Sequence, residues 1–185
     1  GTLLMTVGDG FDFREAAQKL ESGLGKVIRI TDTGAIPADN PFVNKPGASK
    51  PTWSYGHRSP QGLALDPVTG RVYESEHGPQ GGDEINIIAR GANYGWPVAT
   101  KGLDYSGATI SPYKTYPGMK DAIVVWVPSI GPSGLAVYRG AMFKDCGLAH
   151  ADLTGADLEG ALLENCSLLR ATVEGTSFDG CCIYG

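Results

Sequence analysis

The sequence predicts an all-β protein made of two modules. Short apolar runs alternate with glycine and proline, of which the 185 residues contain 27 and 12. Such punctuation is typical of short strands joined by turns. Residues 1–143 carry 13 basic and 13 acidic side chains, whereas residues 144–185 carry 2 and 7, so the net charge of −5 lies in the tail. All four cysteines lie there too, and we therefore predict modules over 1–143 and 144–185.

Composition limits the class of protein. The hydrophobic fraction of 42% is ordinary for a globular protein, and no apolar run approaches the ~18 residues of a membrane span. The apolar run at 2–7 has no basic region before it, so no signal peptide is visible. We expect neither a membrane span nor a nucleic-acid partner.

The first module reads as a series of strands. In chain order they are 3–7, 26–31, the two arms of a hairpin over 61–75 with the turn "DPVTG", 83–88 and 122–128. Asp12 and Glu15 have the spacing of a capping box, which predicts one short helix around 13–21. Short strands at this spacing fit a sandwich, a barrel or a propeller.

The polar segment Glu74–Asn86, "ESEHGPQGGDEIN", joins the hairpin to the strand 83–88. Its plain interpretation is a surface loop. The alternative is a cation site, because exposed carbonyls of glycine and proline beside carboxylates supply the oxygen ligands that a hard cation prefers. The residues alone leave both open.

Four long segments in order carry a family resemblance: "WSYGHRSPQGLALDP", "ESEHGPQGGDEIN", "GANYGWPVATKGLDYSG" and "PSIGPSGLAVYRGAMF". Residues 2–143 thereby resemble the soluble aldose sugar dehydrogenases that use pyrroloquinoline quinone (PQQ), the glucose/sorbosone dehydrogenase family of six-bladed β-propellers. The resemblance implies an oxidoreductase acting on the C1 hydroxyl of an aldose, with PQQ and calcium as cofactors, an electron acceptor, and a periplasmic or secreted location. Since a blade takes roughly 40–45 residues, we expect about three of the six blades here.

The resemblance also implies site residues. Arg58 matches the arginine that contacts the quinone, Gln61 belongs to the same loop, and Ser59 stands where asparagine is common. The carbonyls of Gly78 and Pro79 match those that bind the catalytic calcium.

Four further positions follow from the same resemblance. His77 and Asp83 match neighbouring cofactor-site positions, and Tyr94 lines the same region. Asp9 matches the carboxylate that orients the catalytic histidine, which in the family lies upstream of "GDG" and so before residue 1. We interpret His57 as a packed core histidine.

The tail repeats every five residues from Cys146: CGLAH, ADLTG, ADLEG, ALLEN, CSLLR, ATVEG, TSFDG, CCIYG. The first position is always small and the third always apolar. This resembles the pentapeptide-repeat family, a right-handed quadrilateral β-helix with four units per coil, which implies two coils. The same phase extends upstream over 136–145. An α-helix is the alternative, but glycines at 155, 160, 175 and 180 oppose it.

The cysteines then have a structural reading. Cys146, Cys166 and Cys181 occupy the small inward position of the repeat, where a thiol behaves as a compact apolar group. Unbridged thiols fit a reducing compartment, in disagreement with the location implied for the first module.

Three functions stay open: a PQQ-dependent sugar dehydrogenase, a protein-interaction module based on the acidic tail, and a chimeric or truncated product without catalytic function. We expect the 185 residues alone not to turn over sugar.

Overall fold

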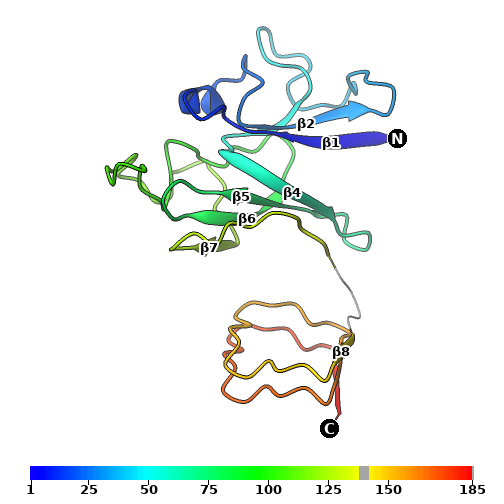
Figure 1. Ribbon diagram of the computed structural model, residues 1–185. Helices are drawn as coiled ribbons and strands as arrows, with labels where there is room; N and C mark the ends of the chain where they lie inside the picture. Colours follow the sequence, from blue (N-terminus) through cyan, green and yellow to red (C-terminus); the bar gives the residue numbers. More distant parts are fainter. Residues whose placement is uncertain (138–141, 185) are drawn as a thin grey trace. The chain divides into compact units, whose positions relative to one another are not determined.

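A computed structural model describes residues 1–137 and 142–184, so part of the expected repeat phase over 136–145 lies outside the described residues. The chain divides into two compact units, Gly1–Ala136 and Val137–Gly185 (Figure 1). The described residues are all-β apart from one short 3₁₀ helix. None of them forms a helix with the length and apolar character needed to cross a bilayer.

The first unit contains two antiparallel sheets (Figure 1). The first has the order β1-β2-β3, and the second has the order β4-β5-β6-β7, so strands adjacent in sequence are adjacent in space. Their bounds are β1 Thr2–Val7, β2 Lys26–Thr31, β3 Thr52–Tyr55, β4 Ser59–Leu65, β5 Val72–His77, β6 Asp83–Ile88 and β7 Val124–Trp126. The predicted hairpin is confirmed as β4 and β5, which pair around the turn that Asp66 begins.

The expected helix is shorter than predicted. It is a 3₁₀ helix, η1, over Arg14–Gln18, and its N-cap residue is Phe13, which makes no side-chain capping bond. The prediction that Asp12 and Glu15 form a capping box is therefore wrong. The chain turns tightly before the helix, with Phe11 in the left-handed region at φ 63°, and so the helix begins too late for Asp12 to cap it.

The number of blades was also overestimated. Among the described residues of the first unit only two sheets form, one of three strands and one of four. Between β6 and β7, residues 89–123 run as turns and isolated bridges rather than strands. Loop segments thus take up the length that the blade estimate assigned to a further sheet.

The apolar core lies between the two sheets. Val27 on β2 and Ile88 on β6 meet at Tyr94, and Leu4, Trp53, Val72 and Ala92 pack around them. Most other fully buried side chains are polar, among them Lys26, His57, Glu74, Asn86 and Asp83. Buried polar groups need specific partners: Lys26 Nζ, for example, donates to the carbonyls of Ala16, Ala17 and Leu24.

The second unit is built by parallel pairing. Strands β8 Met142–Lys144, β9 Leu162–Glu164 and β10 Cys182–Tyr184 pair in the order β10-β9-β8, each 20 residues from the next. Parallel bridges at the same offset join Gly147 to Ser167, Asp152 to Thr172 and Asp157 to Ser177. Hence the five-residue sequence period becomes a 20-residue structural period, and no helix forms among the described residues of this unit.

Every fifth residue of the tail adopts a left-handed backbone. The positions are Asp145, His150, Gly155, Gly160, Asn165, Arg170, Gly175 and Gly180, with φ between 52° and 68°. Glycine takes this conformation without a steric cost, which explains its recurrence in the repeat. Of the apolar third positions, Leu163 is fully buried, whereas Val173 and Ile183 are 43% and 55% exposed.

Candidate functional site

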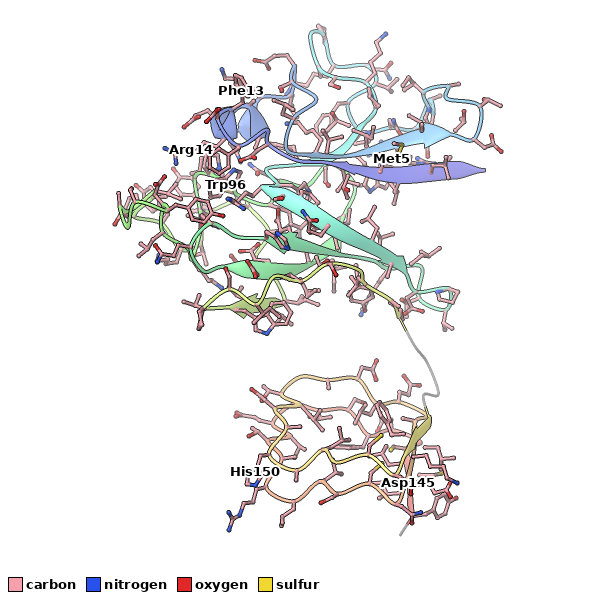
Figure 2. The ribbon with its side chains drawn as sticks, viewed as in Figure 1. Met5, Phe13, Arg14, Trp96, Asp145 and His150 are labelled. Atoms are coloured by element: carbon pink, nitrogen blue, oxygen red, sulfur yellow. The ribbon has the colours of Figure 1, made fainter. Side chains whose placement is uncertain are left out.

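Four loops meet where the strands of the two sheets of the first unit end. They follow β1, β3, β5 and β6, and carry Asp9, Arg58, the Gly78–Gly82 turn and Trp96. Trp96, on the last of these loops, is labelled in Figure 2. Loops on a rigid β scaffold are the usual place for binding and catalytic groups. The bonds between these loops show how the site is held.

Asp9 joins three of the loops. Its backbone N–H donates to the Arg58 carbonyl at 2.8 Å, and its carboxylate accepts from Phe11 N at 2.9 Å and from Trp96 Nε1 at 2.8 Å. The side chain is only 6% exposed. Asp9 therefore positions the Trp96 ring against the loop that carries Arg58.

Arg58 is held in place by aromatic rings and a carbonyl. Its guanidinium lies 5.4 Å from the Trp96 ring centre and 5.7 Å from that of Tyr105. Nη1 donates to the His77 carbonyl at 3.0 Å, and Nη2 donates to the Tyr105 hydroxyl at 3.2 Å. Cation–π contacts of this kind fix a cation without neutralising it, so Arg58 stays available to an anionic ligand.

Asp83 organises the loop that contains Gly78 and Pro79. Its Oδ1 accepts from Gly78 N at 2.8 Å and Ser129 Oγ at 2.9 Å, and its Oδ2 accepts from Ile130 N and Gly131 N, both at 2.8 Å. Because the carboxylate accepts four hydrogen bonds from the protein, Asp83 holds this loop in shape and does not point toward a ligand. A Cβ atom at Gly78 would come within 2.3 Å of the Gly81 carbonyl oxygen, so the tight turn requires glycine there.

A cleft of about 310 Å³ opens between these loops. Three predicted residues line it, Asp9, Arg58 and Pro79, and they are joined by Phe11, Asp12, Arg14, Glu15, Trp96, Asp104, Tyr105 and Ile110. Within the lining, Arg14 and Asp104 form an ion pair at 3.2 Å. A narrower hollow of about 20 Å³ adjoins it and is lined by predicted residues His77, Gly78 and Tyr94 as well as Arg58 and Pro79.

Three predicted residues lie outside both hollows. Gln61 is exposed and donates to the carbonyl and hydroxyl oxygens of Ser59, so these two side chains bond to each other. Asp83 is the third, for the reason given above. The roles of all these residues toward a cofactor stay predictions.

Two buried rings stack on each other beside the narrower hollow. His57 is fully buried, as expected of a packed core histidine, and stacks on Tyr94 with ring centres 4.7 Å apart. The Tyr94 hydroxyl donates to the Ile87 carbonyl at 2.6 Å and accepts from Ala89 N at 2.8 Å. The Tyr94 hydroxyl is thus bonded to backbone groups, and the residue lines the hollow.

Several lining residues could not be identified from the sequence. Trp96 and Tyr105 stand inside a quoted motif, "GANYGWPVATKGLDYSG", but nothing in their spacing showed that they would flank Arg58. Phe11 and Arg14 come from the short segment after β1 and reach the cleft because that segment turns left-handed. The motif containing Trp96 was the one available signal.

The stability of the fold is expected to depend on pH through Glu84, which lines the narrower hollow. Burial, with the charge of Glu76, raises the pKa of Glu84 to about 8. The folded state therefore holds a proton between pH 4.5 and about 8 that the unfolded state has lost, and its stability falls as pH rises through this window. We expect Glu84→Gln to flatten this decline in urea unfolding at pH 5 and pH 8, whereas Glu159→Gln, exposed in the tail, leaves it unchanged. An identical decline in Glu84→Gln would contradict the assignment.

Comparison with known proteins adds the decisive observation. The sequence matches the glucose/sorbosone dehydrogenase family over residues 1–177. The chain belongs to the glucose/sorbosone dehydrogenase family. The match covers the whole first unit and extends past residue 143, where the resemblance read from the sequence ended.

Individual members of the family agree with this placement. The chain is 44% identical over 145 residues to aldose sugar dehydrogenase YliI of Escherichia coli, covering 77% of this chain and 39% of that protein. The apo crystal structure of the soluble E. coli aldose sugar dehydrogenase superposes with a TM-score of 0.70 at 40% identity, over 78% of this chain and 40% of that one. The PQQ-bound aldose sugar dehydrogenase of Streptomyces coelicolor gives 0.60 at 35% identity, over 76% and 37%.

The chain thus spans about two fifths of the length of these family members. Its structural neighbours are sugar dehydrogenases of the propeller fold, and its own sheets are open, not closed into a barrel.

Proposed function

We propose that this chain provides the cofactor-binding side of a PQQ-dependent aldose dehydrogenase, which oxidises the C1 hydroxyl of an aldose and passes the electrons to an acceptor. The observation that carries the proposal is Arg58, held by two aromatic rings at the wall of a cleft that Pro79 also lines. The family membership and the PQQ-bound relative support it.

The residues present fit the cofactor. PQQ is a planar aromatic anion with three carboxylates, which suits a guanidinium between aromatic rings. The cleft volume of about 310 Å³ lies at the lower end of small-molecule sites. No described residue donates a hydrogen bond to the carbonyl of Gly78 or Pro79 in the contacts between loops, so these oxygens are available to a hard cation such as calcium.

When bound, PQQ accepts a hydride and calcium acts as a Lewis acid. The residues of this chain have supporting roles. Arg58 binds the anion and stabilises negative charge that develops on it. Asp83 holds the turn whose carbonyls, at Gly78 and Pro79, we assign to calcium. Asp9 holds Trp96 in place and, by resemblance, orients the catalytic histidine.

For the second unit we propose the right-handed quadrilateral β-helix of the pentapeptide-repeat family, over about 144–185, after a partial propeller over 1–143. The parallel pairing at 20-residue intervals and the left-handed backbone at every fifth residue support it. Protein interaction through this acidic unit is the second candidate function, supported by the exposed carboxylates of Asp152, Asp157 and Glu159. A periplasmic or secreted location remains part of the dehydrogenase proposal.

We expect PQQ to bind the chain in a calcium-dependent manner, and Arg58→Ala to raise its Kd about 10- to 100-fold. A hydrogen bond to a charged group contributes about 1.5–3 kcal/mol, which corresponds to that range. Arg71→Ala, which removes an exposed arginine, is the matched control and should leave the Kd unchanged. The measurement is a PQQ titration by calorimetry with calcium and with chelator.

Calcium alone should bind weakly, because neutral carbonyls leave most of the charge of the ion uncompensated. Its effect on the melting temperature without PQQ is expected to be small. Equal PQQ affinity in Arg58→Ala and in the wild type, or PQQ binding that ignores calcium, would refute the proposed site.

A further inference from the structure

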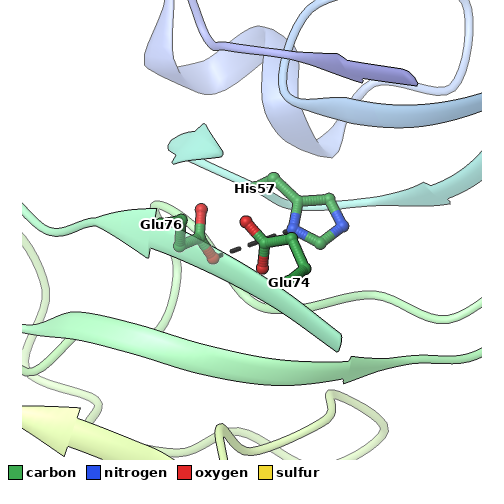
Figure 3. Close-up of side chains that lie close together, drawn as sticks. All are labelled: His57, Glu74 and Glu76. Carbon is green, nitrogen blue, oxygen red and sulfur yellow. Dashed lines mark ion pairs between the residues drawn. The ribbon is translucent and has the colours of Figure 1, made fainter. Parts of the chain in front are cut away.

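A buried cluster of three ligand-type side chains lies behind the cleft (Figure 3). Glu74 and Glu76 are two positions apart on β5, so their side chains point to the same face of the strand. His57 comes from the loop after β3 and faces them. All three are buried: His57 and Glu74 are 0% exposed and Glu76 is 4% exposed. One nitrogen or oxygen atom of each side chain lies within 4.8 Å of the corresponding atoms of the other two.

The protein anchors one atom of His57 and one of Glu74, and it anchors both carboxylate oxygens of Glu76. His57 Nε2 bonds to Ser54 Oγ at 2.9 Å, and Glu76 Oε2 accepts from Arg58 N at 2.7 Å. Asn86 Nδ2 donates to Glu74 Oε2 and Glu76 Oε1, both at 3.1 Å. These bonds orient the cluster as surrounding contacts orient the ligands of a metal site.

The remaining atoms have no hydrogen-bond partner among the described residues. They are His57 Nδ1, Glu74 Oε1 and Asn86 Oδ1, and all three side chains are fully buried. Buried polar atoms without a partner are uncommon in folded proteins and often mark an ion or water. With the ring proton assigned to Nε2 and donated to Ser54, the lone pair of Nδ1 is free for a cation.

The charge of the cluster points the same way. Glu74 and Glu76 place two carboxyl groups, 0% and 4% exposed, on one face of β5. His57 Nδ1 lies 3.7 Å from Glu76 Oε1, which is long for a hydrogen bond. A carboxylate pair in a buried position requires a positive charge nearby, supplied by either a proton or a metal ion.

We propose that His57, Glu74 and Glu76 bind one first-row divalent metal ion. One imidazole with two carboxylates suits ions such as Mn²⁺, Fe²⁺ and Zn²⁺. The proposed site uses side chains, and is distinct from the calcium assigned to the carbonyls of Gly78 and Pro79. Because Glu76 also holds the backbone of Arg58, the metal would stiffen the support of the cofactor-binding arginine.

Mn²⁺ is the probe, because its preference for oxygen and nitrogen ligands keeps it off the four free thiols of the tail. We expect the full chain to bind one equivalent in excess calcium, measured by loss of the free Mn²⁺ signal in electron paramagnetic resonance. Pulsed measurements should show coupling to an imidazole nitrogen. The coupling should persist in the double variant His77→Gln/His150→Gln, which retains His57 alone of the three histidines.

Substitutions then assign the ligands. Glu74→Gln and His57→Gln should each raise the Kd for Mn²⁺ at least tenfold, whereas Glu174→Gln, which changes an exposed carboxylate of the second unit, should raise it less than threefold. Absence of one-equivalent binding would overturn the proposal and favour a proton shared by the two carboxyls. Displacement of Mn²⁺ by calcium, or loss of nitrogen coupling in the double variant, would overturn it too. These wild-type and double-variant readings decide the matter even if a cluster variant does not fold.

Discussion

Asp83→Ala should lower the free energy of unfolding by about 3–5 kcal/mol. The substitution leaves three backbone N–H groups and one hydroxyl without their acceptor, and each unsatisfied buried donor costs about 1–3 kcal/mol before water relieves part of the loss. Asp121→Ala, which removes an exposed carboxylate, is the control and should change stability by less than about 0.5 kcal/mol. Chemical unfolding followed by tryptophan fluorescence measures both, and equal stability of Asp83→Ala and wild type would contradict the role given to this side chain.

The same carboxylate contributes to the loss of stability in acid. Burial alone would raise the pKa of Asp83, but donation from Gly131 N and its three other partners outweighs burial and lowers it. The stabilisation is therefore present above the ordinary aspartate pKa and is lost as pH falls through the lowered folded value. Asp83→Asn should lose this part of the acid dependence, because it cannot titrate.

The polypeptide of residues 1–185, taken alone, should give no turnover above the free-cofactor background when supplied with PQQ, calcium, an aldose and an artificial electron acceptor. Oxidation at C1 needs a base within hydrogen-bond reach of the hydroxyl, and loss of a general base costs about 10²–10⁴-fold. His57 is fully buried, His77 Nε2 is bonded to the Pro132 carbonyl at 2.6 Å, and His150 belongs to the second unit.

Reduction of the acceptor dye, monitored by absorbance, tests this expectation. Free PQQ with calcium is the reference, and Arg58→Ala controls for cofactor held in the cleft. Sugar-dependent dye reduction above that reference, abolished by Arg58→Ala, would contradict the prediction and make His77 the next candidate base. Binding of PQQ without turnover would agree with both the proposed site and the missing base.

Much of the fold could be predicted because strands of this chain alternate clearly. The hairpin of β4 and β5 joins two strand-like segments through a short turn that contains proline and glycine, and its pairing is local in sequence. The helix was misjudged because a capping box is a local pattern, whereas the backbone turn at Phe11 decides where the helix begins. The expected number of blades was too high because it was calculated from chain length alone. Length does not distinguish residues in strands from residues in loops such as 89–123.

The candidate site was predicted only through its motifs. Arg58 and Pro79 carry the resemblance and do line the cleft. Tyr105 also lines it, but it contacts Arg58 from 47 residues further along the chain, and no sequence pattern indicates this contact. The cluster behind the cleft was invisible for a different reason. Glutamate on a strand is usually solvated, and the burial of Glu74 and Glu76 depends on the sheet and loop that cover them.

The 20-residue pairing of the second unit restricts how its gene can change. An in-frame duplication of one whole period would add a further layer and leave every existing pair in register, since each residue meets its counterpart 20 positions away. A single inserted codon would instead move the left-handed positions and the apolar third positions out of step with the paired segments beside them. Such a segment is expected to evolve in length by whole periods, while its residue identities at exposed positions drift freely.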